Sequence, residues 1–264
     1  MRYRGFTLIE LVITLVVLSI LAVGVSSYLG FGARLYSDVA EREQILGQSR
    51  FVAERMIREL RNAAPNSVRV NQIPGVISCL EFTPVVASGV YSLLPVSPES
   101  GTELHLQLYD WSSGLLGSRI IVYPTEPQHY YDTGDSHQTL LSATVLNASD
   151  ITSPENGATV KLQLNTAHSF AAHSPEKRFY LLTRPVSYCA RDGEIRRLQG
   201  HNYNSGFPMP AAGVLMAQQV KQAEFLVQQA VLNRNAVVNL FLQFGSDTSS
   251  DMFFNYEVHL PNVP

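Results

Sequence analysis

The chain has 264 residues, of which 45% are hydrophobic and 16% are charged, and its formal net charge is −3. This length can hold one large or two modest globular domains. Lys and Arg are mixed with Asp and Glu and form no basic stripe, so the composition argues against a nucleic-acid partner.

A long apolar segment lies near the N-terminus. No charged residue occurs from Leu11 to Gly32, and most residues in this run are Leu, Val and Ile. A bilayer core of about 30 Å requires about 20 residues of α-helix, and soluble helices are seldom apolar on every face. Arg2 and Arg4 precede the run, so the positive-inside rule predicts a single span with its N-terminus in the cytoplasm.

A secretory signal peptide is the main alternative for this segment, because the small residues at 22–24 resemble a cleavage site. Glu10, however, lies at the start of the apolar run. A lone carboxylate at membrane depth costs about 2.5–3.5 kcal/mol on insertion scales and therefore needs a partner. Neither a signal peptide nor a simple anchor provides one.

The residues around Glu10 resemble a known processing motif. Gly5-Phe6-Thr7-Leu8-Ile9-Glu10 follows a short basic leader and opens the apolar helix, as in the prepilin cleavage motif of type IV pilin-like proteins. The resemblance implies that a prepilin peptidase cleaves between Gly5 and Phe6 and that Phe6 becomes N-methylated. It further implies an anchor in the inner membrane, a periplasmic domain, and major and minor pilins as partners. Such a chain is a structural subunit and not an enzyme.

Electrostatics suggests why Glu10 would be needed. After cleavage, Phe6 carries a cationic amine among apolar helices, where an unpaired charge is costly. Within one helix Phe6 and Glu10 lie at different levels. A neighbouring subunit that is displaced along the fibre axis would bring amine and carboxylate level, so we expect the pair to form between subunits.

Beyond the span the pattern becomes amphipathic and predicts that the helix continues to Asn62, just before Pro65. A helix over 6–62 would be about 85 Å long at 1.5 Å per residue. The apolar positions expected to face the domain are Leu35, Val39, Leu46, Ala53, Ile57 and Leu60. The predicted organisation is a leader at 1–5, a transmembrane helix at 6–33, an amphipathic continuation at 34–62, and a β-rich periplasmic domain at 63–264.

Short alternating runs separated by Gly, Pro, Asn, Asp and Ser follow Pro65 and predict β-strands. Residues 178–198 indicate two strands that turn at 191–193, where Asp-Gly favours a hairpin. Residues 223–244 indicate a hairpin that turns at 233–235, with a partly helical segment as the alternative. The predicted fold class is α+β, a type IV pilin-like fold with a long helix packed on an antiparallel β-sheet.

The arrangement of the C-terminal half is similar to that of the larger minor pilins of MSHA pili and of the J-type pseudopilins of type II secretion. This resemblance implies a minor pilin that initiates or caps a fibre, with a J-type pseudopilin as the alternative. A tip subunit that binds a surface or ligand is also compatible. The clusters His129-Tyr130-Tyr131 and Asn202-Tyr203, which contain aromatic rings, are candidates for binding a sugar. A membrane-anchored enzyme is disfavoured because the sequence has no recognisable catalytic constellation.

The chain has two cysteines, Cys79 and Cys189, which are too far apart in sequence for a CxxC redox pair and too few for a four-thiolate zinc site. An oxidising compartment would favour a disulfide between them, and two buried free thiols are the alternative. Asp132 and Asp135 could share a calcium ion, but too few other oxygen ligands are assured. We therefore expect no metal and no cofactor.

Overall fold

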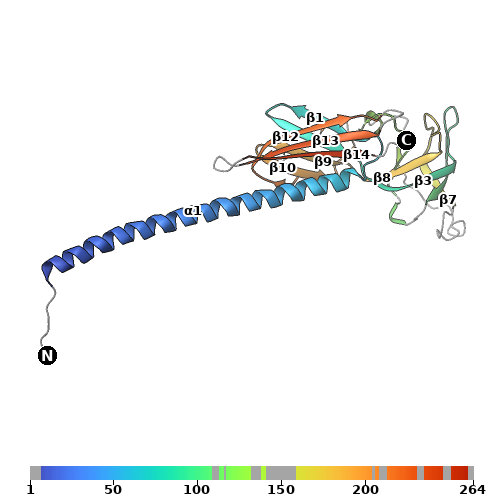
Figure 1. Cartoon of the computed structure of the whole chain (residues 1–264). Helices are drawn as coiled ribbons and strands as arrows, with labels where there is room; N and C mark the ends of the chain where they lie inside the picture. The colour runs from blue at the N-terminus through green and yellow to red at the C-terminus, as the bar shows by residue number, and fades with distance from the viewer. Residues whose placement is uncertain are drawn as a thin grey trace.

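The computed structural model describes residues 7–108, 113–115, 117–131, 138–140, 159–203, 206–207, 213–230, 235–245 and 251–260. One long helix, α1 (Leu8–Leu60), extends away from a β-rich body that lies at its C-terminal end (Figure 1). The α+β class with a long N-terminal helix packed against antiparallel β-sheets is therefore confirmed.

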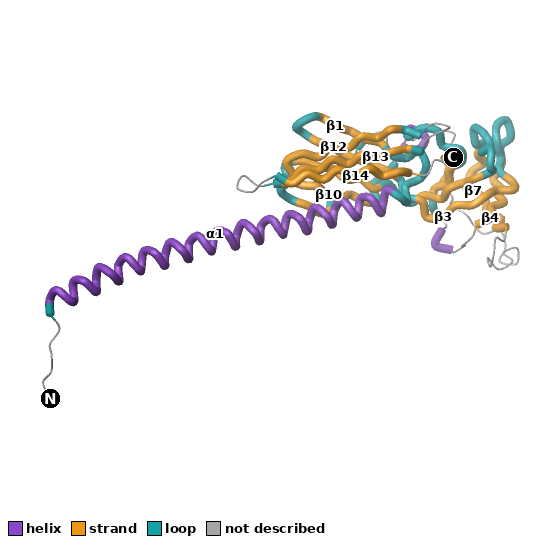
Figure 2. Tube along the Cα trace, in the orientation of Figure 1, coloured by secondary structure: helices purple, strands orange, loops and turns teal. Residues whose placement is uncertain are grey.

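The helix α1 is continuous across its apolar and amphipathic halves (Figure 2). The glycines at 24, 30 and 32 do not break it. No other part of the described chain lies within 4 Å of where their Cβ atoms would be. At its end, the backbone N–H groups of Arg61 and Asn62 donate to the carbonyls of Ile57 and Glu59. These bonds satisfy groups that would otherwise be unpaired at a helix terminus.

The buried stripe of α1 begins later than the sequence indicated. Ala53 and Leu60 are buried as predicted, whereas Leu35 and Val39 are 55% and 51% exposed. Contacts with the sheets begin near Glu41, which accepts a hydrogen bond from Gln219. The residues of α1 that the body buries are Ile45, Ser49, Val52, Ala53, Met56 and Leu60.

The part of the body nearest the helix, which we term the proximal lobe, contains two antiparallel sheets (Figure 2). The five-stranded sheet has the order β1-β2-β9-β10-β11. Its strands are β1 (Arg69–Ile73), β2 (Ile77–Phe82), β9 (Val186–Arg191), β10 (Glu194–Gln199) and β11 (Val214–Ala217). The second sheet comprises β12 (Val220–Gln228), β13 (Ala236–Phe244) and β14 (Met252–Leu260).

One hydrophobic core joins these two sheets to α1. Strand β12 contacts β1, β2 and β9, whereas α1 contacts β11 and β14. The helix therefore closes the open side between the last strands of the two sheets. Its Val52 and Met56 side chains are fully buried in the same core as Phe82 and Leu240, and burial of such side chains contributes about 1.5–3 kcal/mol each.

The other part of the body, the distal lobe, is built on one antiparallel six-stranded sheet with the order β6-β5-β8-β3-β4-β7. Its elements are β3 (Val85–Leu93), β4 (Gly101–Leu108), η1 (Ser113–Leu115), β5 (Arg119–Ile121), α2 (Gln128–Tyr131), β6 (Gln138–Leu140), β7 (Thr159–His168) and β8 (Arg178–Leu182). It has a separate core that includes Leu104, Leu106 and Phe179. At Gly89 a Cβ would collide with the carbonyl oxygen of Gln107 on β4, so only glycine fits there.

The distal lobe is inserted between β2 and β9 of the proximal lobe, so residues 178–198 differ from the prediction. They form three strands, because Thr183 to Pro185 carry the chain from β8 in the six-stranded sheet to β9 in the five-stranded sheet. The turn between β9 and β10 is confirmed, with Asp192 and Gly193 at positive φ. The β12–β13 hairpin is also confirmed, although residues 231–234 of its turn lie outside the described residues.

Candidate assembly site

The N-terminal half of α1 extends away from the described part of the body (Figure 1). Its large apolar side chains are exposed. Its exposed large apolar residues are Leu8, Ile9, Leu11, Val12, Ile13, Leu15, Val16, Val17, Leu18, Ile20, Leu21, Val23, Val25, Tyr28, Leu29 and Phe31. Soluble monomers rarely expose contiguous apolar patches of more than a few hundred Å². Among the described residues, α1 is long and apolar enough to cross a membrane.

Polar groups in this half are few. The hydroxyl groups of Thr14 and Ser19 donate to carbonyl oxygens of the same helix, at 2.9 and 2.7 Å. Glu10 is the only charged residue from Leu8 to Ala33, and no described residue pairs with its exposed carboxylate. Its place in the first turn is favourable for a negative charge, because the N-terminus of a helix carries a partial positive charge. Glu10 is thus a polar group on this surface that is available to an intermolecular partner.

The other two residues of the predicted processing site, Gly5 and Phe6, lie outside the described residues. The structure therefore leaves cleavage and methylation as predictions.

At the opposite end of α1, Glu59 connects the helix to the five-stranded sheet. Its Oε2 accepts hydrogen bonds from the Tyr188 hydroxyl at 2.8 Å and from Nε of Arg197 at 2.9 Å. Its Oε1 accepts from Nε of Arg55, one turn earlier, at 3.0 Å. Burial raises the pKa of the Glu59 carboxyl, but the hydrogen bonds from Arg197, Tyr188 and Arg55 more than offset this effect, so the pKa lies below its ordinary value.

Replacing Glu59 should weaken the docking of the helix. We expect Glu59→Gln to lower the free energy of unfolding by on the order of 1 kcal/mol at neutral pH, after allowance for solvent screening. Because the folded-state pKa is lowered, the carboxylate contributes fully above the ordinary glutamate pKa of about 4.3. The contribution is lost as the pH falls through the folded-state value.

Denaturant unfolding at several pH values should therefore show a difference between wild type and Glu59→Gln that shrinks on acidification. Glu54→Gln is the matched control, since Glu54 is exposed on the same helix. A difference that stays constant from pH 7 to below about 4 would contradict the role of the charge.

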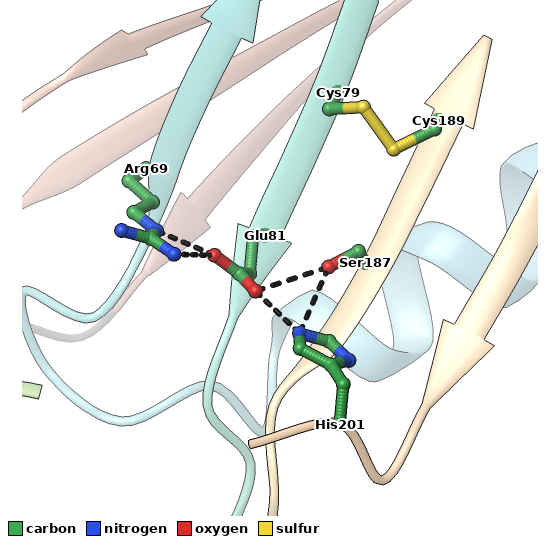
Figure 3. Close-up of a disulfide and its surroundings, with 6 residues drawn as sticks. All are labelled: Arg69, Cys79, Glu81, Ser187, Cys189 and His201. Atoms are coloured by element: carbon green, nitrogen blue, oxygen red, sulfur yellow. Dashed lines mark hydrogen bonds and ion pairs between the residues drawn. A yellow bond between two sulfur atoms is a disulfide. The ribbon is translucent and has the colours of Figure 1, made fainter. Parts of the chain in front are cut away.

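A second polar cluster lies beside the cysteines in the five-stranded sheet (Figure 3). Glu81 is only 1% exposed, and its carboxylate pairs with the guanidinium of Arg69 and with Nε2 of His201. The hydroxyl group of Ser187 donates to the same carboxylate. The guanidinium of Arg69 also lies 3.7 Å from the ring centroid of Tyr131. The cluster therefore connects the proximal lobe to α2 of the distal lobe.

Cys79 and Cys189 form a disulfide between directly opposite positions of β2 and β9 (Figure 3). The sequence separation is 110 residues, and every strand from β3 to β8 lies inside this loop. The disulfide therefore joins the two strands from which the distal lobe is inserted.

The remaining sequence-based candidates have different outcomes. Asp132 and Asp135 lie outside the described residues. Among the residues that the structure describes, no group of three His, Cys, Asp or Glu side chains could hold a metal ion.

Tyr130 and Tyr131 are at most 1% exposed, and their hydroxyls donate to carbonyls at 65 and 67. Their rings are not accessible to a ligand, so the expectation that Tyr130 and Tyr131 bind a sugar is wrong.

Comparison with family models gives a match over the N-terminal segment. The chain matches the prokaryotic N-terminal methylation motif over residues 1–26. No curated protein and no solved structure matches the chain. The motif coincides with the apolar part of α1 that carries Glu10, and the rest of α1 packs on antiparallel sheets. Together these features support a type IV pilin-like protein.

Proposed function

We propose that the chain is a minor pilin that enters a type IV pilus through its N-terminal helix and initiates or caps the fibre. The observation that carries this proposal is the exposed apolar half of α1 with Glu10 as its single charge. A surface of this kind can contact lipid while the subunit is in the membrane. It can then pack against the helices of neighbouring subunits when the subunit enters the fibre. The methylation motif over residues 1–26 supports the same route.

The proposed topology has a leader at 1–5, a membrane helix at 6–33, its amphipathic continuation at 34–62 and a periplasmic domain at 63–264. Arg2 and Arg4 favour a cytoplasmic N-terminus. The Cys79–Cys189 disulfide supports a periplasmic domain, because disulfides persist in oxidising compartments.

Assembly would exchange lipid for the apolar core of a fibre. Such a transfer gains little from the hydrophobic effect, so packing and polar contacts must drive it. In this proposal the Glu10 carboxylate pairs with the methylated amine of Phe6 in an adjacent subunit. The prepilin peptidase and the other major and minor pilins are therefore the expected partners.

Fractionation of cells that express the protein tests this proposal. Fibres are sheared from the cells and washed, and the protein is detected together with other pilins in the sheared material and in the inner membrane. We expect the protein in both fractions, at low abundance in the fibres. A protein found only in the membrane, with no other pilin co-purifying from detergent extracts, would contradict the proposal.

The type of fibre is a finer part of the proposal. We infer an MSHA-type pilus from the pattern of the C-terminal half, which resembles that of the MSHA biogenesis protein MshO. The alternative is a J-type pseudopilin of type II secretion. Neighbouring genes for MSHA components would support the first assignment, and genes for type II secretion components would support the second.

A further inference from the structure

A pocket of about 830 Å³ lies where the two lobes meet. The distal lobe contributes Arg119 of β5, and the segment between β8 and β9 contributes Arg184. The end of β10 and the residues after it contribute Gln199, Asn202 and Tyr203. Small-molecule sites of about 300–1,000 Å³ are common at interfaces between domains.

The charge of this interlobe pocket is positive. Two guanidinium groups line it, and none of the described residues that line it is an Asp or a Glu. Several kcal/mol are lost when a charge is removed from water without a partner. An anionic ligand would therefore offset the desolvation free energy of a guanidinium group that is buried in the folded chain.

Arg119 is the more buried of the two guanidinium groups, so most of the desolvation free energy falls on it. One of its Nη atoms donates to the carbonyl of Tyr130 at 3.0 Å, and its guanidinium lies 4.3 Å from the ring centroid of Tyr203. Its Nε is buried and has no hydrogen-bond partner among the described residues. Burial lowers the pKa of this guanidinium, as expected for a desolvated cation.

The surrounding contacts hold both cations in place before any ligand binds. Nη1 of Arg184 donates to the carbonyl of Gly200 at 3.0 Å, and the hydroxyl of Tyr203 donates to the carbonyl of Thr183. Pre-organised groups lose less entropy on binding than mobile ones. The pocket is thus a positive site with its charged groups already positioned.

We propose that the interlobe pocket binds an acidic sugar whose carboxylate pairs with Arg119 and Arg184. Guanidinium groups match the planar geometry of a carboxylate. The exposed amides of Gln199 and Asn202 can donate to and accept from sugar hydroxyls. This binding activity is separate from fibre assembly, and the purified chain can be tested for it without a pilus.

The test uses the full chain in detergent micelles and isothermal titration calorimetry. The acidic probes are galacturonate and glucuronate disaccharides and N-acetylneuraminate, and the control is the uncharged galactose disaccharide. We expect at least one acidic sugar to bind at least about tenfold more tightly than the neutral one, since a charged hydrogen bond contributes about 1.5–3 kcal/mol. The affinity should fall as the salt concentration rises.

Variants assign the binding to the pocket. We expect Arg119→Gln and Arg184→Gln each to weaken binding about tenfold or more. Arg184 is exposed, so its variant keeps the assay valid if Arg119→Gln unfolds the distal lobe. The matched control is Lys161→Gln, which removes an exposed cation from β7 at the far edge of the same sheet and should leave the affinity unchanged.

Several results would overturn the proposal. One is that no acidic sugar binds the wild type more tightly than the neutral disaccharide. Another is that Arg184→Gln binds the acidic sugar as tightly as Lys161→Gln does. A short Asp- or Glu-containing peptide that binds as tightly as the sugar would also overturn it, because the pocket would then recognise a carboxylate of a protein partner.

Discussion

Glu10→Ala should abolish most incorporation of the subunit into fibres while leaving it in the membrane. Removal of the carboxylate should leave membrane insertion intact or make it slightly easier, because a charge no longer has to enter the bilayer. Loss of one partner of a buried ion pair costs about 3–5 kcal/mol, which corresponds to a decrease of at least about a hundredfold in the assembly equilibrium. Sheared fibres and inner membranes from wild-type and variant cells should be compared by quantitative immunoblotting.

Two further variants separate charge from helix structure. Glu10→Gln keeps the size of the side chain and should fail in the same way, whereas Glu54→Ala removes an exposed carboxylate from the docked half of α1 and should assemble normally. All three variants should still be cleaved after Gly5. Normal incorporation of Glu10→Ala would contradict the intersubunit ion pair.

Loss of the disulfide should lower the free energy of unfolding by about 2–4 kcal/mol, because the bond closes a long loop in the unfolded chain. The loop between Cys79 and Cys189 contains every strand of the distal lobe. The proximal core should still form, since β2 and β9 also pair through backbone hydrogen bonds. Denaturant unfolding of the full chain in detergent, with and without reductant, measures the effect.

The double variant Cys79→Ala/Cys189→Ala provides the control, because reductant should not change its unfolding midpoint. The oxidised wild type should contain no thiol that reacts with a labelling reagent. Two reactive thiols in the folded protein, or a midpoint that reduction leaves unchanged, would exclude a stabilising disulfide.

The sequence predicted the elements whose signals are local. The unbroken apolar run predicted the helix, and Pro65 marked its end within a few residues of Leu60. Asp192 and Gly193 predicted a hairpin because few residues adopt positive φ at low cost. Each of these features depends on neighbours in the chain, so periodicity and turn chemistry were sufficient to identify them.

Features that depend on distant contacts were missed. Leu35 and Val39 follow the amphipathic pattern but remain exposed. The body contacts the helix only from about Glu41 onward, so these two side chains have nothing to pack against. The division of residues 178–198 between two sheets was also missed. The alternation of apolar and polar residues predicts a strand but does not show which sheet the strand joins. Pro185, which lies between β8 and β9, was the one local sign that the chain leaves one sheet for another.

The candidate sites show the same division. Glu10 was recognisable from sequence because a charge in an apolar run is conspicuous. Glu59 was not, because its partners Tyr188 and Arg197 lie more than 100 residues away. Asn202 and Tyr203 were candidates for binding a sugar, but the positive charge of their pocket comes from Arg119 and Arg184. Arg119 belongs to the distal lobe, so the sequence did not show that it lies beside them.

Mass spectrometry of the mature N-terminus tests the central claim, that this chain is processed and assembled as a pilin-like subunit. The protein is extracted from the inner membrane of its native host, and its N-terminal peptide is sequenced. We expect a chain that begins at Phe6 and carries a methyl group on its amine, with residues 1–5 absent. An intact terminus at Met1, or a chain that begins after Gly24 as a signal peptidase would produce, would contradict the claim.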